Sequence, residues 1–405
     1  MNRIRHFNIR IAAALAGCIA ATIAPAQSVP AASVAFSNEV EAALVRTMQS
    51  LRAGGIPSAL REIDATLDKN PNFRLGYFIK GDLLMASAGS PVAFDVHQSP
   101  PEMVASLRDE ARVRLTRYFD GPPVGQLPSA LLQLSPQQSH AILVDSGKSR
   151  MYVYRNVDGK PEYVTDFYVS SGKNGVDKVR EGDAKTPIGV YRVTSTIPKS
   201  KLADIYGPGA FPINYPNEVD RKYGRHGSGI WIHGTPSNTY SRPPRASDGC
   251  VVLTNDDFAQ VSHWIEPGVT PVVIAGSVEW QTPEQWQAGR SAFSEALQKW
   301  RADWESLNTD AYLAHYSKAF RADGKDWQGW AEHKRRINAG KSYVKVKIDN
   351  LSIFEYPATP GYASFVMVTF DQDYKSSNNG TRMKKRQYWQ QENGQWKIVY
   401  ESTAT

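Results

Sequence analysis

The sequence predicts a multidomain protein with an α-helical N-terminal region, a central mainly-β body and a C-terminal α+β domain. Three observations support this prediction. Apolar residues recur at helical spacing up to about residue 119, the period changes to two from residue 139, and helices followed by long strands fill the last third. The chain has 405 residues, of which 41% are hydrophobic and 21% charged, a globular composition with room for two or three domains.

Residues 1–26 are predicted to be a secretory signal peptide. An arginine-rich start precedes an apolar run, and Ala24-Pro25-Ala26 is a small-x-small cleavage site. Residues 15–18 also resemble a lipoprotein box, which would make Cys18 a lipidated N-terminus. The apolar run continues past Cys18 to Ile23, however, and this favours cleavage after Ala26. We therefore expect a periplasmic or otherwise extracytoplasmic protein that is associated with the cell envelope and has no transmembrane span.

Export makes the cysteine count informative. The chain has two cysteines, and cleavage after Ala26 leaves Cys250 with no partner for an internal disulfide. Because a lone thiol oxidises easily outside the cytoplasm, its presence favours a reactive residue over a buried inert one. The net charge of +7 favours anionic partners. For an exported protein we expect cell-wall carboxylates and no nucleic acid, although excess lysine can also be a solvated face.

Residues 27–135 are predicted to form a helical N-terminal region. Apolar residues from Ala42 to Leu51 recur at helical spacing, and Gly54-Gly55 ends the pattern. A second helix, a turn at Asn70-Pro71 and a third helix resemble one tetratricopeptide-like hairpin. No repeat at a fixed period is present, so we expect a packing or docking element rather than an array.

Residues 138–276 are predicted to form an all-β sandwich or barrel-like body. Short β-rich runs cover 140–144, 150–154 and 163–169, with turn residues between them and a closing run at 271–274.

Residues 277–296 are expected to form a linker helix, and residues 297–405 an α+β domain. Aromatic residues recur at helical spacing from Trp286 to Trp304, and long strands follow from residue 343 to residue 400. Aromatic residues in such a module are usually core, so a ligand pocket there is the less favoured interpretation.

The candidate chemistry lies in residues 229–252. His233 and Cys250 are 17 residues apart, and each borders an apolar strand-like run. A nucleophilic cysteine needs a base within hydrogen-bond reach, and two adjacent strands would bring His233 there. We expect an imidazolium partner to favour the thiolate.

Neighbouring backbone groups supply further candidates. Gly249 allows a tight turn, so the N–H groups of Gly249 and Cys250 are candidate oxyanion donors. The Gly234 carbonyl is a candidate to orient His233, since the motif places no carboxylate there. The main chemical rival is a metal site, but no C-x-x-C or H-E-x-x-H spacing is present, and we expect no metal or other cofactor. The ligands of that rival site would be His226, His233, Asp248 and Cys250.

These residues resemble the L,D-transpeptidase catalytic-domain family. His233-Gly234-Thr235, then Ser247-Asp248-Gly249-Cys250-Val251-Val252, match its signature, and residues 185–191 match its Thr-Pro-x-Gly-x-aromatic element. The resemblance covers about residues 140–276. It implies that Cys250 attacks after the third residue of a peptidoglycan stem peptide, forms a thioester and expels D-alanine, with His233 as base and then acid. An amine from a second stem would then give a cross-link, and water a trimmed tripeptide.

Two positions depart from the family pattern. Asp248 stands where the family usually has histidine, and Val252 where it often has arginine. Asp248 could bind an acceptor amine or water, or cap the turn. Arg242 or Arg245 could replace the missing arginine. The candidate substrate-binding residues are Ser247, Asp248, Thr235 and Arg245.

The flanking regions resemble those of wall-modifying enzymes that affect cell shape or lipoprotein attachment. The C-terminal stretches 370–376 and 396–401 resemble the cone-like nuclear-transport-factor-2-like (NTF2-like) fold, which implies a pocket or a homodimer surface. We therefore expect a peptidoglycan L,D-transpeptidase. An L,D-carboxypeptidase, an amidase that releases a wall-linked lipoprotein, and a non-catalytic wall-binding protein stay open as alternatives.

Overall fold

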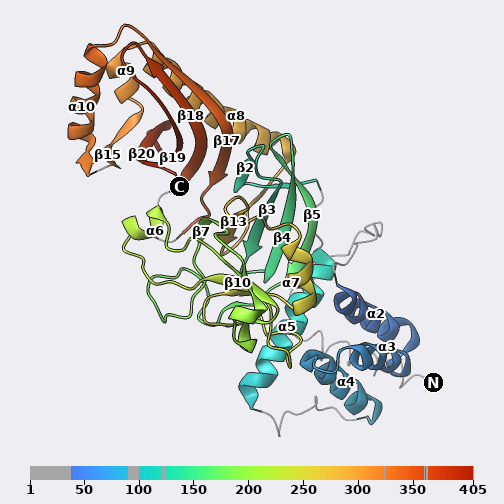
Figure 1. The fold of residues 1–405 in the computed structure, drawn as a ribbon. Coiled ribbons are helices and arrows are strands. Elements are labelled where there is room, and N and C mark those ends of the chain that lie inside the picture. The colour runs from blue at the N-terminus through green and yellow to red at the C-terminus, as the bar shows by residue number, and fades with distance from the viewer. Residues whose placement is uncertain are drawn as a thin grey trace.

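The computed structural model describes residues 38–89, 100–120, 125–322, 324–359, 361 and 364–404. Three parts follow one another along an elongated molecule, with the N-terminal helices at one end and the C-terminal sheet at the other (Figure 1). The predicted signal peptide, with Cys18, lies outside the described residues. Within them, no helix is long and apolar enough to cross a membrane.

The N-terminal part is helical, as predicted. Asn38 caps the first helix by accepting a hydrogen bond from the Val40 N–H at 2.7 Å, and Gly55, with φ of +75°, separates the first two helices. The apolar faces of the helices meet in one core cluster. The resemblance to a tetratricopeptide hairpin stays a prediction. The helices are α2 (Glu39–Gly54), α3 (Ile56–Lys69), α4 (Arg74–Ser87) and α5 (Pro101–Asp120).

The central part is β-rich, also as predicted, and is built on two sheets. The first has the order β5-β4-β3-β13-β7 and the second β12-β10-β9-β8, while β6 pairs with β11. Helices α6 (Glu218–Lys222) and α7 (Asn255–Ser262) and two short 3₁₀ turns, Lys199–Lys201 and Asp204–Tyr206, connect them. The strands are β3 (His140–Asp145), β4 (Arg150–Val157), β5 (Lys160–Tyr168), β6 (Ser171–Gly172), β7 (Gly189–Arg192), β8 (Ile197–Pro198), β9 (Gly209–Pro212), β10 (Trp231–His233), β11 (Arg245–Ser247), β12 (Val251–Val252) and β13 (Pro271–Ala275).

The first sheet is buried on both faces, which explains the unbroken apolar run in β3. Side chains alternate between faces along a strand. Ile142 and Val144 therefore pack between the two central sheets, whereas Ala141 and Leu143 pack toward the C-terminal domain. The catalytic and C-terminal parts thus share a hydrophobic core.

The C-terminal domain wraps a strongly curved sheet around helices α8 and α10 (Figure 1). Its sheet has the order β16-β15-β20-β19-β18-β17-β2, so its last strand comes from before the catalytic domain. A second early strand, β1, pairs with β14. The elements are β1 (Leu127–Pro128), β2 (Leu131–Gln133), β14 (Trp280–Gln281), α8 (Pro283–Glu305), α9 (Thr309–Leu313), β15 (Tyr316–Ala322), β16 (Lys325–Asp326), α10 (Trp327–Ala339), β17 (Val344–Glu355), β18 (Phe365–Ser376), β19 (Gly380–Glu392) and β20 (Gln395–Thr403).

Two predicted boundaries differ from the structure. Residues 127–133, assigned to the helical region, are strands that pair with β14 and β17. The predicted linker, 277–296, is part of the C-terminal domain, because α8 runs unbroken to Glu305 and its Phe293 is fully buried in that domain's core. The Trp286 indole N–H also donates to the Leu131 carbonyl at 2.9 Å, which ties the helix to the early strand.

Candidate active site

Cys250 and His233 are carried by adjacent parallel strands. In the pairing of β10 with β12, Ile232 lies opposite Val251 and His233 opposite Val252. Cys250 comes directly before β12, and its thiol donates to the Gly229 carbonyl at 3.4 Å, just before β10. The pairing therefore brings the two predicted catalytic residues to neighbouring positions in one sheet.

The turn that presents Cys250 is fixed by close contacts. Gly249 has a φ of +128°, and a Cβ at this position would lie 2.7 Å from the Lys185 carbonyl oxygen. The Thr186 hydroxyl donates to the Gly249 carbonyl at 3.0 Å. The Ser247 hydroxyl donates to the Cys250 carbonyl at 2.6 Å and accepts from the Gly249 N–H at 3.1 Å. Only glycine fits at position 249, and these hydrogen bonds hold the turn that presents Cys250.

These contacts correct two predictions. Ser247 is only 2% exposed and its hydroxyl bonds to the backbone, so it holds the turn and does not face a substrate. The Gly249 N–H, predicted as an oxyanion donor, already donates to Ser247. The Cys250 N–H therefore stays the candidate oxyanion donor.

His233 is oriented by the backbone. Its Nδ1 lies 2.7 Å from the Gly234 carbonyl oxygen, the contact expected for an orienting group. Because Nδ1 donates to this carbonyl, Nε2 carries the free lone pair. The Tyr206 ring packs edge-on against the imidazole at a centroid distance of 5.1 Å. A Cβ on residue 234 would lie 2.4 Å from the Asn255 Oδ1, so only glycine fits beside His233.

The pair is neutral at rest, which differs from the predicted thiolate and imidazolium. Burial lowers the pKa of His233 to about 4. The hydrogen bond to Gly234 offsets part of this decrease in the pKa, and the charge of Arg242 adds a smaller one. Burial raises the pKa of the Cys250 thiol, although the Trp231 N–H and the charge of Arg242 partly offset this. At neutral pH His233 is therefore a free base and Cys250 a protonated thiol.

The loop between the two residues is held by the N-terminal helices. The Tyr240 hydroxyl donates to Asn38 Oδ1 at 3.1 Å, and its ring packs on Phe73 at a centroid distance of 5.0 Å. The Ser241 hydroxyl donates to the Glu110 carboxylate at 2.7 Å. Thr235, predicted to bind substrate, is 1% exposed and donates its hydroxyl to the Tyr240 carbonyl at 3.4 Å. Thr235 therefore braces the loop, which corrects that prediction.

Of the two loop arginines, Arg242 is the one beside the reactive pair. It is half-buried, its carbonyl accepts from the Tyr168 hydroxyl at 2.8 Å, and its charge acts on Cys250, His233 and Asp248. The Arg245 side chain is 62% exposed and lies 3.7 Å from an Asp109 carboxylate oxygen, toward the N-terminal helices. The geometry thus supports Arg242 in place of Arg245 as the substrate-binding arginine.

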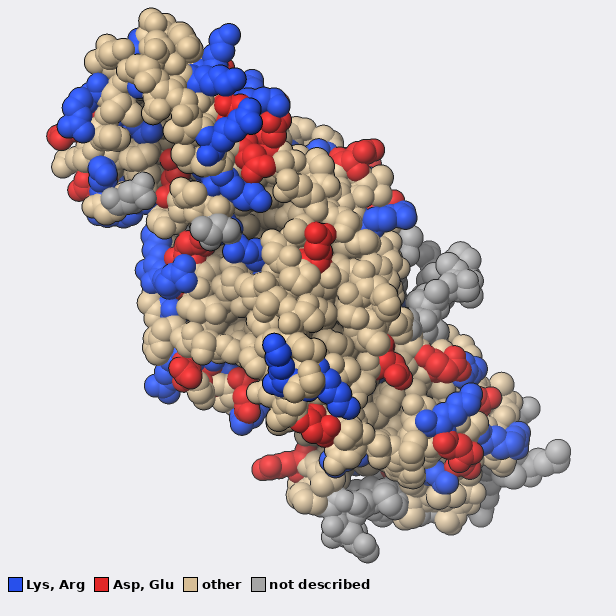
Figure 2. Space-filling model, viewed as in Figure 1, with Lys and Arg blue, Asp and Glu red and all other residues tan. Residues whose placement is uncertain are grey.

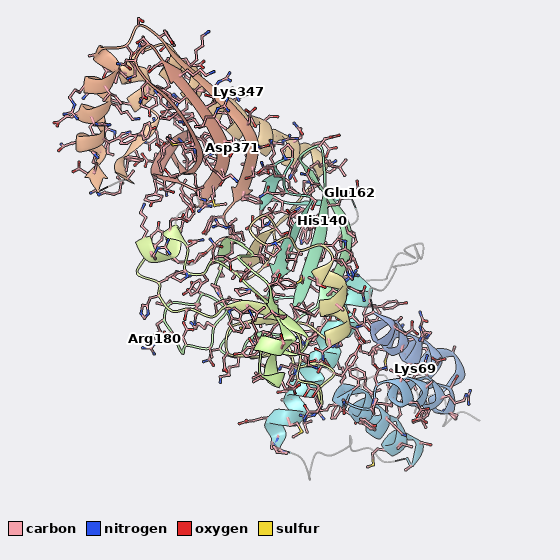
Figure 3. The ribbon with its side chains drawn as sticks, viewed as in Figure 1. Lys69, His140, Glu162, Arg180, Lys347 and Asp371 are labelled. Atoms are coloured by element: carbon pink, nitrogen blue, oxygen red, sulfur yellow. The ribbon has the colours of Figure 1, made fainter. Side chains whose placement is uncertain are left out.

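Charged side chains surround the entrance to the site. The Asp248 side chain is 85% exposed, and its carboxylate lies 2.8 Å from Lys173 Nζ. Lys178 is buried on the loop labelled by Arg180 in Figure 3, where it pairs with Asp183 at 2.7 Å and its charge favours the Cys250 thiolate. The sequence carried a signal for Thr186, in the Thr-Pro element, but none for Lys173 or Lys178. Among the described residues, no group of three or more His, Cys, Asp or Glu side chains is placed to hold a metal.

Comparison with known proteins identifies two domains. Residues 139–274 match the L,D-transpeptidase catalytic domain, and residues 292–402 match the Cds6 C-terminal NTF2-like domain. No curated protein sequence matches the chain. Bd1075 from Bdellovibrio bacteriovorus is 28% identical, with a TM-score of 0.61 over 69% of this chain and 98% of that chain. The helical cell shape determining protein Pgp2 from Campylobacter jejuni is 26% identical, with a TM-score of 0.57 over 67% of this chain and 95% of that chain.

Proposed function

We propose that this chain, which carries an L,D-transpeptidase catalytic domain followed by an NTF2-like domain, is a cysteine acyltransferase acting on peptidoglycan stem peptides. The observation that carries the proposal is the parallel pairing of β10 with β12, which brings His233 beside the strand that follows Cys250. The likeness to a helical cell shape determining protein supports a role in cell shape. Export, attachment to the cell envelope and a homodimer through the C-terminal domain stay predictions.

In the first half of the reaction, the Cys250 sulfur attacks the carbonyl carbon of the third stem residue, which is bonded to the nitrogen of the terminal D-alanine. Because the resting thiol is protonated, His233 Nε2 removes its proton as the carbon–sulfur bond forms. The Cys250 N–H stabilises the oxyanion. His233 then gives the proton to the departing amine of D-alanine, and a thioester remains.

Arg242 would bind the substrate carboxylate. The terminal D-alanine carries a carboxylate next to the bond that breaks, and a half-buried guanidinium beside Cys250 suits it. This assigns to Arg242 the role for which the sequence also offered Arg245.

In the second half, an acceptor attacks the thioester carbonyl, transfers a proton to His233 and releases the thiol. The contact of Asp248 with Lys173 favours an amine acceptor, because an ammonium group already sits at this exposed carboxylate at 2.8 Å. Since exposed ion pairs are weak, an incoming amine of a second stem can replace Lys173. This order of events is transpeptidation. Attack by water would instead be L,D-carboxypeptidase trimming.

Mass spectrometry of tetrapeptide muropeptides incubated with the full chain tests the proposal. New dimers that join an L-centre to a D-centre, lost in Cys250→Ala, would support transpeptidation. Tripeptides lost in the same variant would mean hydrolysis by the same thioester. Tetrapeptides left equally untouched by both proteins would overturn acyl transfer on free stems, and would favour lipoprotein release or a wall-binding role.

A further inference from the structure

A cleft with a volume of about 140 Å³ lies where the catalytic domain meets the C-terminal sheet. The catalytic domain contributes the end of β7 and the start of α6, and the C-terminal domain contributes β17, β18 and β19. Figure 2 shows the surface hollowed where the C-terminal lobe meets the centre, with Lys and Arg side chains along the upper edge. Alternate residues of β19 face opposite sides of the sheet. Lys384 and Arg386 therefore line the cleft, whereas Lys385 pairs with the buried Glu401 at 2.6 Å.

The lining of this cleft carries an excess of positive charge. Its ionised side chains are Arg192, Lys384 and Arg386 against one carboxylate, Glu218. That carboxylate is already occupied, because Arg386 donates to one of its oxygens at 2.6 Å and the Tyr388 hydroxyl to the other at 3.3 Å. Both carboxylate oxygens of Glu218 therefore already accept hydrogen bonds, which leaves this carboxylate little capacity to pair with a second guanidinium.

Arg192 is a guanidinium of the cleft that makes no direct ion pair among the described residues, although the charge of Glu218 acts on it. Its backbone is bonded to Asn214, but in the described part of the chain its guanidinium has no hydrogen-bond or ion-pair partner. Arg192 is half-buried, and burial together with the charge of Arg386 lowers the pKa of its guanidinium. A cation held in this way gains more from an incoming anion than a fully solvated one.

The rest of the lining suits a planar anion with polar neighbours. Ser135, Asn214 and Thr369 contribute polar side chains to the lining, and Phe354 and Met367 contribute apolar ones. A carboxylate fits this arrangement, since guanidinium groups bind it with two parallel hydrogen bonds.

The cleft is distinct from the catalytic site but on the same chain segment. Thr186, which bonds to Gly249, precedes Arg192 by six residues, and six extended residues span at most about 20 Å. Two linked stem peptides can cover such a distance, because an extended tetrapeptide reaches roughly 14 Å.

We propose that this interdomain cleft binds a carboxylate of a second, linked stem peptide, with Arg192 as its main ligand and Arg386 and Lys384 beside it. The inference rests on the proposed function, because it takes its ligand from the same polymer. The C-terminal domain would then complete a binding site that the catalytic domain alone lacks.

The test measures binding and turnover separately. Binding of a cross-linked fragment with two stems is measured by calorimetry on the full chain with Cys250→Ala, with and without Arg192→Gln. We expect the Arg192 change to weaken binding about tenfold or more, as for a lost charge-assisted hydrogen bond, and high salt to weaken it as well. Lys384→Gln, at an exposed position, should weaken binding less and has little risk of unfolding the domain. Arg155→Gln is the matched control, because Arg155 is exposed on β4 and lies outside the cleft.

Turnover of single tetrapeptides by Arg192→Gln with Cys250 intact separates the two proposals. Unchanged turnover with lost two-stem binding is the expected result. If Arg192→Gln, Lys384→Gln and the control bind the two-stem fragment with equal affinity, the proposed binding site is wrong, whatever the turnover. If the parent protein turns over no stem peptide, acyl transfer fails, while Arg192-dependent binding would still support the cleft. Arg192-dependent binding of peptide-free glycan, with its free lactyl carboxylates, but not of stem peptides would overturn the peptide ligand.

Discussion

Where the catalytic domain meets the N-terminal helices, three acidic and three basic side chains are buried together. Its contact with the C-terminal sheet instead combines a shared apolar cluster with a cleft in which three basic residues face one glutamate. The six ion-paired charges of the first contact balance one another, whereas the four charges that line the cleft of the second do not. The balanced set consists of Glu41, Glu110, Asp166, Arg114, Arg117 and Arg150.

The ion pairs of the balanced contact form one continuous network. Glu41 joins two arginines, with one oxygen 3.1 Å from Arg114 and the other 3.0 Å from Arg150. Arg150 also lies 3.4 Å from Asp166, and the Arg114 guanidinium covers the Tyr168 ring at 3.8 Å. The Tyr168 hydroxyl in turn holds the backbone of the loop between His233 and Cys250. This contact therefore has a structural role, whereas an unbalanced one has charge left to bind a ligand.

Breaking the balanced contact should have the largest effect on stability. Glu41→Gln leaves the buried Arg114 and Arg150 without their shared carboxylate, so we expect a loss of about 3–5 kcal/mol in the free energy of unfolding. Chemical denaturation measures this loss. Glu162→Gln, in an exposed pair with Arg155, should cost less than about 1 kcal/mol. Equal losses in the two variants would show that the buried network adds nothing.

The two contacts should also respond oppositely to pH. Burial raises the pKa of Asp220, beside the C-terminal domain, to about 6, so the folded protein binds more protons than the unfolded chain between about pH 4 and 6. Stability from this group therefore falls as pH rises through that window. Asp220→Asn should stabilise the protein at neutral pH by up to about 3 kcal/mol, and the gain should vanish below about pH 4.

Asp166 in the N-terminal contact gives the matched comparison. Burial alone would raise its pKa, but its bonds to Arg117 and the charge of Arg150 lower it overall. Its stabilisation is present above the unfolded pKa and is lost only as pH falls through the lower folded value. Asp166→Asn should therefore destabilise the protein at neutral pH. Thermal unfolding of both variants from pH 3 to pH 8 checks the opposite signs, and a shared sign would contradict the comparison.

The loop held by the N-terminal helices gives a third prediction. Arg242→Gln should lower kcat/KM by roughly 10- to 100-fold, the size expected for one lost charged hydrogen bond to the substrate. Arg245→Gln, whose side chain is exposed, should change it less than about threefold. Steady-state kinetics on one tetrapeptide substrate measures both. A larger loss for Arg245 would restore the original sequence prediction.

The smallest effect concerns the acid limb of the pH profile, which is the fall of kcat/KM at low pH. Because His233 has a pKa of about 4, kcat/KM should stay level from neutral pH to about pH 5 and fall near pH 4. The charge of Arg242 contributes to this lowered pKa, so Arg242→Gln should move the limb toward higher pH. A limb near pH 6.5 in the unaltered protein would mean that His233 is not buried during turnover.

Periodicity and motif spacing were enough to predict the three parts and the adjacent strands that border His233 and Cys250. Helices α2 to α5 have local apolar patterns, and the strands that carry the pair follow from short apolar runs. The pKa directions were missed, because they depend on how deeply each side chain is buried. Thr235 and Ser247 were misassigned for the same reason, since their hydroxyl groups are used by the backbone.

Long-range pairing accounts for the other differences. Arg150 opens a strand and looks like a surface charge in the sequence, yet it is 1% exposed because Glu41 and Asp166 surround it. Residues 131–133 carry no signal for the strand they join, which is more than 200 residues away. The choice between Arg242 and Arg245 likewise depends on helices far along the chain.

Because the early strands β1 and β2 belong to the C-terminal domain, the catalytic domain is an insertion within the sequence of that domain. The segments that leave and re-enter the C-terminal domain lie side by side, and the Ser129 N–H donates to the Glu279 carbonyl at 3.0 Å. A fragment that begins at residue 297 would lose α8's first turns and bare the edge of β17, which invites aggregation. Joining residues 127–133 to the segment from residue 279 would keep both early strands, but Phe354, Phe365 and Tyr388 would lose the apolar side chains of the catalytic domain that cover them. The C-terminal domain is therefore encoded in two separate pieces of the chain, and separating it from the catalytic domain requires both the early strands and a substitute for the shared apolar cover.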